Sequence, residues 1–131
     1  MSLFNSHSVE ILILLFFIIT YFMSVIEKLG DWKGSVLYYS NHFKKTVLQK
    51  IIPLLLLNII IFEIVTLFLL LIGLYFLVEE SSFIIAKIGM EVSAITLLQF
   101  LVGQRLAKDY QGAMNVTIYF ILNIIGIYIL S

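Results

Sequence analysis

Long runs of apolar residues alternate with short polar segments along this chain. Each run is close to the roughly 20 residues that a helix needs to cross a bilayer. By hydropathy the runs cover residues 8–28, 52–78, 83–103 and 113–130. The polar segments at 79–82 and 109–112 are typical of tight turns between helices. The pattern predicts an all-α fold, an integral membrane four-helix bundle that forms a single domain over residues 1–131.

The connection between the first and second runs is longer than most helix–helix connections. Its apolar residues recur at spacings that place them on one helical face, and they are Val36, Phe43, Val47 and Ile51. Ser35 could cap the start of such a helix. We expect a short amphipathic helix over about 35–50 that lies in the membrane interface with its apolar face down. The alternative is an extension of the second span with a kink at Pro53.

Composition strengthens the membrane assignment. The chain has 131 residues, of which 62% are hydrophobic and 12% are charged, whereas a soluble domain is about half apolar and about a quarter charged. Lys and Arg together balance Asp and Glu, so the net charge is zero and a global basic patch for nucleic acid is not expected. The absence of cysteine excludes disulfides, CxxC redox chemistry and thiolate metal sites.

The basic residues are distributed unevenly between the two sides of the bundle. Seven of the eight lie in the first and third loops, and they are Lys28, Lys33, Lys44, Lys45, Lys50, Arg105 and Lys108. The other side carries Glu79 and Glu80. By the positive-inside rule, the first and third loops face the cytoplasm and both termini face the periplasm of a bacterial inner membrane.

Ionisable residues at membrane depth are costly, so each needs a partner or a function. Glu63 lies in the second run with apolar residues on both sides. Counting from the 79–82 turn places Gln99 at a similar depth, and Lys28 ends the first run near the same level. We expect an ion pair between Lys28 and Glu63, with Gln99 and Asn58 as hydrogen-bonding neighbours. The alternative is a protonated Glu63 held by Gln99.

Lys87 and Glu91 lie four residues apart in the third run, so one helical face carries both. They either form a salt bridge within the helix, or Lys87 extends to the outer surface.

The fourth run contains a stripe of small and hydrogen-bonding residues, which include Asn115, Tyr119 and Asn123 between Gly112 and Gly126. Membrane helices use such residues to pack together. The simplest interpretation is a bundle core with satisfied polar groups. The sharper alternative is a cavity for a quinone, a lipid or an ion.

Catalytic and metal-binding patterns are missing from the sequence. His7 and His42 would lie on opposite sides of the membrane, so no paired haem or metal ligands are expected. No GxGxxG or P-loop pattern is present. We therefore identify no catalytic residue and no cofactor motif, and do not expect an enzyme that acts on its own.

Three segments resemble the DoxX/DoxD-like family of small four-helix bacterial membrane proteins. They are SVIEKLGD at the end of the first run, FEIVTLFLLLIGLY in the second and VGQRLAKDYQG before the fourth. Within them, Lys28 precedes the first turn, and Glu63 is followed ten residues later by Gly73. The resemblance implies a four-helix bundle and a link to membrane oxidoreductases, including a quinone-reducing thiosulfate oxidation subunit. Thiol chemistry, which some relatives are thought to use, is excluded here because the chain has no cysteine.

These features favour a non-catalytic membrane subunit of a respiratory or redox complex, which binds a quinone or another lipid-like molecule in the bundle. The alternative is a purely structural accessory or assembly subunit of a larger membrane complex. Either function implies the lipid bilayer and other membrane subunits as partners. A small transporter is a weaker third hypothesis, because four short helices without an inverted repeat leave little room for alternating access.

Overall fold

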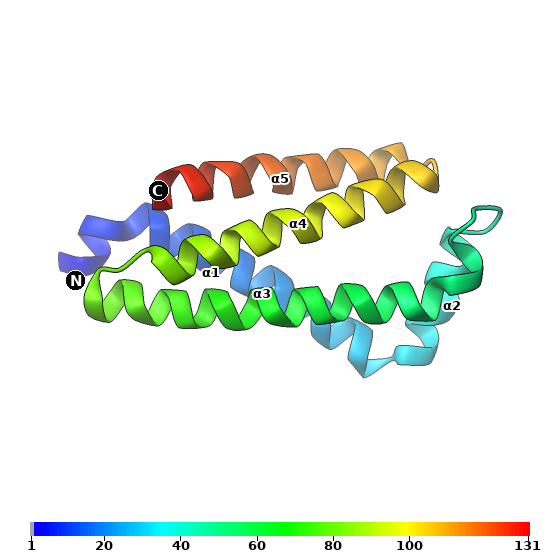
Figure 1. Ribbon diagram of the computed structural model, residues 1–131, viewed down its shortest axis with the longest axis horizontal. Helices are drawn as coiled ribbons and strands as arrows, with labels where there is room; N and C mark the ends of the chain where they lie inside the picture. The colour runs from blue at the N-terminus through cyan, green and yellow to red at the C-terminus, as the bar shows by residue number, and fades with distance from the viewer. Residues whose placement is uncertain (1) are drawn as a thin grey trace.

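The computed structural model describes residues 2–131, with side chains described from Ser6 onward. This part of the chain is almost entirely helical (Figure 1). The helices are α1 (Ser2–Gly30), α2 (Trp32–His42), α3 (Ile52–Glu80), α4 (Ile84–Leu106) and α5 (Tyr110–Leu130), and a 3-10 turn, η1 (Gln49–Ile51), precedes α3. The helices α1, α3, α4 and α5 are long and apolar enough to cross a membrane, so the four spans and the all-α class are confirmed.

The two ends of the bundle differ in what they carry. The start of α1, the α3–α4 turn and the end of α5 lie at one end, which we call the hairpin end (Figure 1). The helix α2 and the α4–α5 turn lie at the other, which we call the α2 end. Between them α4 packs against both α3 and α5, while α1 packs mainly on α3 and touches α5 less.

Local chemistry sets the helix ends. Asp31 caps α2 by accepting a hydrogen bond from the Gly34 N–H at 3.1 Å, and Asp109 caps α5 in the same way through the Gly112 N–H at 2.9 Å. Ser81 ends α3 in the left-handed region with φ 52, and its N–H donates to the Leu77 carbonyl. The capping residue of α2 is thus Asp31, and not Ser35 as expected from the sequence.

The helix predicted over 35–50 is only partly correct, because α2 ends at His42. The Thr46 hydroxyl donates to the Phe43 carbonyl and accepts from the Leu48 N–H, so this side chain stabilises a turn. Lys45 has φ 69, which no helix continues through. The alternative was that the second span extends further towards the N-terminus, and the structure shows only the short η1 turn there. Pro53 lies in the first turn of α3.

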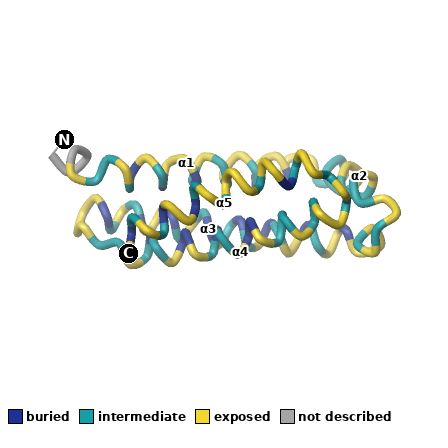
Figure 2. The backbone as a smooth tube through the Cα atoms, turned by 90° about the horizontal axis from the view of Figure 1, so that it is seen from above, coloured by how far each residue is buried: buried dark blue, intermediate teal, exposed yellow. Residues whose placement is uncertain are grey.

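Packing is densest towards the hairpin end. Buried positions recur along α3 every three or four residues, as expected for one helix face turned to the core (Figure 2). Phe17, Leu70, Leu77 and Met90 are among the fully buried side chains there. Gly73 lets α3 and α4 approach closely, since a Cβ at this position would lie 2.5 Å from the Ala86 Cα. Towards the α2 end, α3 and α4 separate (Figure 1).

Candidate functional site

A cavity of about 520 Å³ lies where α3 and α4 have separated, at the α2 end of the bundle. Helices α1 to α4 all contribute to its wall, which is mostly apolar. The polar side chains that line it are Ser24, Lys28, Tyr39, His42, Asn58, Gln99 and Gln104. A predominantly apolar cavity with a few convergent polar groups is the usual form of a small-molecule site.

Lys28 and Glu63 form the expected ion pair beside this cavity. The Lys28 Nζ lies 3.0 Å from the Glu63 Oε1, and the two side chains are 8% and 1% exposed. This Oε1 has no hydrogen-bond partner, so the contact is close but not aligned as a hydrogen bond. Lys28 also donates to the Ser24 hydroxyl and lies 5.7 Å from the centre of the Phe100 ring. The ammonium group is therefore held by a carboxylate, a hydroxyl and an aromatic face.

Asn58 and Gln99 are neighbours, as expected, but they bond to each other. The Asn58 Nδ2 donates to the Gln99 Oε1 at 3.4 Å, which joins α3 to α4 across the cavity wall. Neither amide is bonded to Glu63 among the described side chains, so the arrangement with Glu63 held by Gln99 is not the one adopted. Each amide keeps hydrogen-bonding capacity for a bound molecule, because this bond is long and uses only one atom of each side chain.

The cavity borders the outer, lipid-facing side of the bundle. Asn58, Val102 and Leu106 line the cavity and are themselves exposed, so its opening lies beside them. Their exposed neighbours on α3 and α4 are large apolar residues such as Leu54 and Leu57. A molecule that dissolves in the hydrocarbon layer could therefore enter sideways between these helices.

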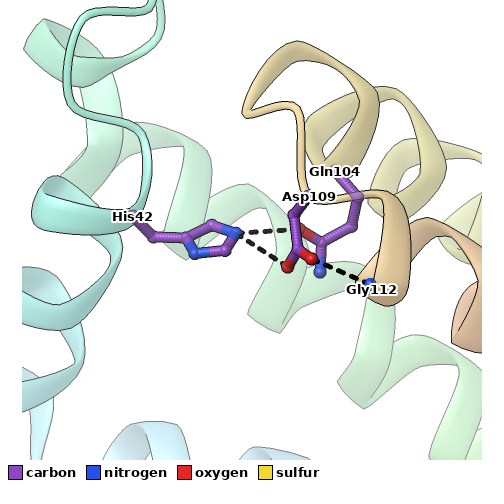
Figure 3. A network of polar contacts seen from close by, with 4 residues as sticks. All are labelled: His42, Gln104, Asp109 and Gly112. Carbon is purple, nitrogen blue, oxygen red and sulfur yellow. Dashed lines mark hydrogen bonds and ion pairs between the residues drawn. The ribbon is translucent and has the colours of Figure 1, made fainter.

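Three side chains that were not selected from the sequence form a polar network at the α2 end (Figure 3). The His42 Nε2 lies 2.8 Å from the Gln104 Oε1 and 3.5 Å from the Asp109 Oδ2. Asp109 is held in turn by the Gly112 N–H. The network ties α2 to the α4–α5 turn and brings His42 to the cavity wall. The sequence contains one indication of this network: loops one and three, which contain His42 and Asp109, are assigned to the same side of the membrane.

Tyr39 on α2 also contributes to the cavity wall and was not selected from the sequence. Burial raises the pKa of the Tyr39 hydroxyl, and the negative charge of Glu63 raises it further. The hydroxyl is therefore protonated at neutral pH and can donate a hydrogen bond.

The polar residues of the fourth span separate into two groups. Asn123 is buried and donates from Nδ2 to the Met90 carbonyl at 2.9 Å, while its Oδ1 has no partner. Asn115 and Tyr119 lie on the exposed face of α5, away from the cavity. The expected core stripe is thus correct for Asn123 and Gly126, which are buried, but not for Asn115 and Tyr119. A second buried contact, missed from the sequence, joins the Tyr21 hydroxyl to the Ser93 Oγ at 2.8 Å.

Lys87 and Glu91 lie far from the cavity. The ion pairs among the described side chains are Lys28–Glu63 and His42–Asp109, so of the two arrangements considered for Lys87 the salt bridge within α4 is not the one adopted. Lysine followed by glutamate is the weaker order for such a pair, which is consistent with its absence. Glu91 is exposed on a face of apolar residues, where an unpaired charged side chain is unfavourable inside the membrane.

The cavity wall combines hydrogen-bond donors with apolar surface. Among the residues that the structure describes, no three His, Asp or Glu side chains are grouped to hold a metal ion. The wall offers hydrogen-bond donors from Lys28, Tyr39, Asn58 and Gln99, which suit a ligand with carbonyl or other acceptor oxygens. The apolar remainder suits a hydrocarbon tail or ring.

A comparison of the chain with protein-family models, with curated proteins and with solved structures finds no match. Function is therefore inferred from the bundle and its cavity.

Proposed function

We propose that this multi-pass membrane protein binds a lipid-like molecule with an acceptor-rich head, such as a quinone, in the cavity at the α2 end. The observation that carries the proposal is the composition of that cavity, which joins apolar walls to the donors of Lys28, Tyr39 and Gln99. An opening beside the exposed Asn58 and Val102 supports entry from the hydrocarbon layer.

The polar end of the ligand would lie near Lys28. Glu63 and Ser24 already hold this ammonium group, so it is fixed in position at the cavity wall before a ligand binds. A preorganised donor of this kind loses little side-chain entropy on binding. The quinone carbonyl would accept from Lys28 or Gln99, and its ring and tail would contact apolar residues such as Leu55 and Ile59.

In the cell we place the chain in a bacterial inner membrane as a non-catalytic subunit of a respiratory or redox complex. The resemblance of three segments to the DoxX/DoxD-like family supports this assignment, and the basic residues of the first and third loops support a cytoplasmic α2 end. The protein would hold the quinone close to a partner subunit that carries the redox centre.

Extraction of the purified protein tests the proposal. The protein would be isolated from native membranes in mild detergent, and the organic extract analysed by mass spectrometry for quinones and lipids. We expect stoichiometric recovery from the wild type and a severalfold loss from Ile59→Trp, because the indole would fill the cavity. Ile61→Trp is the matched control, since Ile61 lies two residues away on the exposed face of α3. Equal recovery from the two variants would refute the proposal.

A further inference from the structure

The exposed face of α4 carries a carboxylate where every neighbour on the same stripe is aliphatic. Along this stripe the exposed residues are Ile84, Ile88, Glu91, Ile95, Leu98 and Val102. Glu91 lies seven residues into α4, or about 10 Å below the helix start at the rise of an α-helix. A glutamate is too short to reach the headgroups from this depth. Among the described side chains, no ion pair is formed with Glu91.

Lys87 lies one helical turn away and supplies the complementary charge. It is half-buried, and no ion pair joins it to Glu91 among the described side chains. One face of α4 thus presents a positive and a negative group about 6 Å apart along the helix axis. A surface with both charges on a single turn is complementary to a second copy of itself.

We infer that this face of α4 is the interface of a homodimer, in which Glu91 of each copy pairs with Lys87 of the other. A two-fold axis along the membrane normal makes the two pairs equivalent, as in any isologous interface. The lysine stem spans the offset in height between the two groups. Ala94, one turn beyond Glu91, is small enough to let the two α4 helices approach.

The position of α4 in the bundle leaves this face accessible. Helices α1 and α4 lie on opposite sides of the molecule (Figure 2), and α3 and α5 flank α4 without covering its outer stripe. The cavity at the α2 end involves the other half of α4, from Gln99 onward. Val102, at the end of the stripe, borders the cavity opening, so the interface is proposed for the first half of α4, around Lys87 and Glu91, and does not depend on the ligand site.

Cross-linking tests the interface directly, because the chain has no cysteine of its own. Ile88→Cys or Ile95→Cys would be introduced into the full chain, and native membranes would be oxidised before electrophoresis. We expect a disulfide-linked dimer from at least one of these variants. Ile19→Cys, on the exposed face of α1, is the matched control and should remain monomeric. Absence of a dimer from both α4 variants would overturn the proposal in favour of a different partner subunit.

Charge reversal then tests the pairing itself. In the cross-linking background, Glu91→Lys and Lys87→Glu should each reduce the dimer to the level of the Ile19→Cys control, because like charges then meet across the interface. Co-expression of the two variants with different tags should restore a mixed dimer, which also shows that both variants fold. A salt bridge within one helix could not produce this rescue. Unchanged cross-linking in the single variants, or no rescue on co-expression, would overturn the proposal.

Discussion

At the scale of single residues, the ion pair between Lys28 and Glu63 is the feature that most constrains the bundle. Glu63 is 1% exposed and lies in the middle of an apolar helix, so its charge is compatible with folding only while Lys28 is beside it. The ammonium group is held further by Ser24 and Phe100. The pair also joins α1 to α3 and forms one edge of the cavity.

Removal of either partner should therefore destabilise the protein in a coupled way. Breaking a buried ion pair by removing one member costs about 3–5 kcal/mol. We expect Glu63→Ala to lower the free energy of unfolding by an amount at the lower end of this range, because the flexible stem of Lys28 can carry its charge towards the interface. Glu63→Gln should cost less, since it keeps the shape and a hydrogen-bonding group. Thermal unfolding in detergent measures both changes.

A double-mutant cycle distinguishes the pair from two independent effects. Addition of Lys28→Met to Glu63→Ala should recover part of the loss, because the uncompensated charge is then removed. Strictly additive losses would contradict the pairing and would indicate that Glu63 is protonated or contacts a ligand.

At the scale of elements, the contact between α3 and α4 decides how the bundle is divided. Gly73 brings the two helices together near the hairpin end, and Gly89 lies against Leu69 and Leu70 on α3 in the same region. Small residues at such positions let membrane helices pack through their backbones. Further along, the side chains between α3 and α4 are Asn58 and Gln99, which bridge a wider gap. The close contact at Gly73 and the cavity therefore both result from the way α3 and α4 pack against each other.

Gly73→Ala should separate α3 from α4. The added Cβ would lie 2.5 Å from the Cα and 2.6 Å from the N of Ala86, and backbone atoms cannot move aside without shifting the helix. Overpacking of this kind costs about 1–3 kcal/mol, so the melting temperature in detergent should fall. Gly30→Ala is the control, because a Cβ there meets nothing within 4 Å. An unchanged or raised melting temperature for Gly73→Ala would show that the helices are not in this close contact.

At the scale of the whole molecule, the two ends of the bundle have different compositions. The hairpin end is closely packed and carries Glu79 and Glu80, while the α2 end holds the cavity, the His42 network and seven of the eight basic residues. An even number of spans puts both termini at the hairpin end. The charge asymmetry predicts that this end faces the periplasm.

Labelling of single cysteines tests this orientation. In intact cells, a membrane-impermeant maleimide should label Ser131→Cys and Ser2→Cys, because both termini are expected outside. Ser40→Cys on α2 should react only after the membrane is permeabilised. Labelling of Ser40→Cys in intact cells, with protection of Ser131→Cys, would show that the protein has the opposite orientation in the membrane.

Much of the architecture could be predicted because it depends on local patterns. Hydropathy located the four spans, since each span must be apolar over its own length whatever its neighbours are. The Lys28–Glu63 pair could also be predicted, because the rise of an α-helix converts sequence distance from the hairpin into depth. Depth alone limits the partners of a buried charge to a few residues.

What the tertiary structure decided is how the helices are rotated and where they separate. Helical rotation buries Asn123 but leaves Asn115, Tyr119 and Glu91 exposed, a difference that their shared polarity does not reveal. After α2 ends at His42, the Thr46 side chain bonds to the Phe43 carbonyl in the turn that follows, and the contact of His42 with Asp109 joins residues far apart in the chain. The cavity exists because α3 and α4 touch at Gly73 and diverge beyond it, which is a property of two helices together and of neither alone.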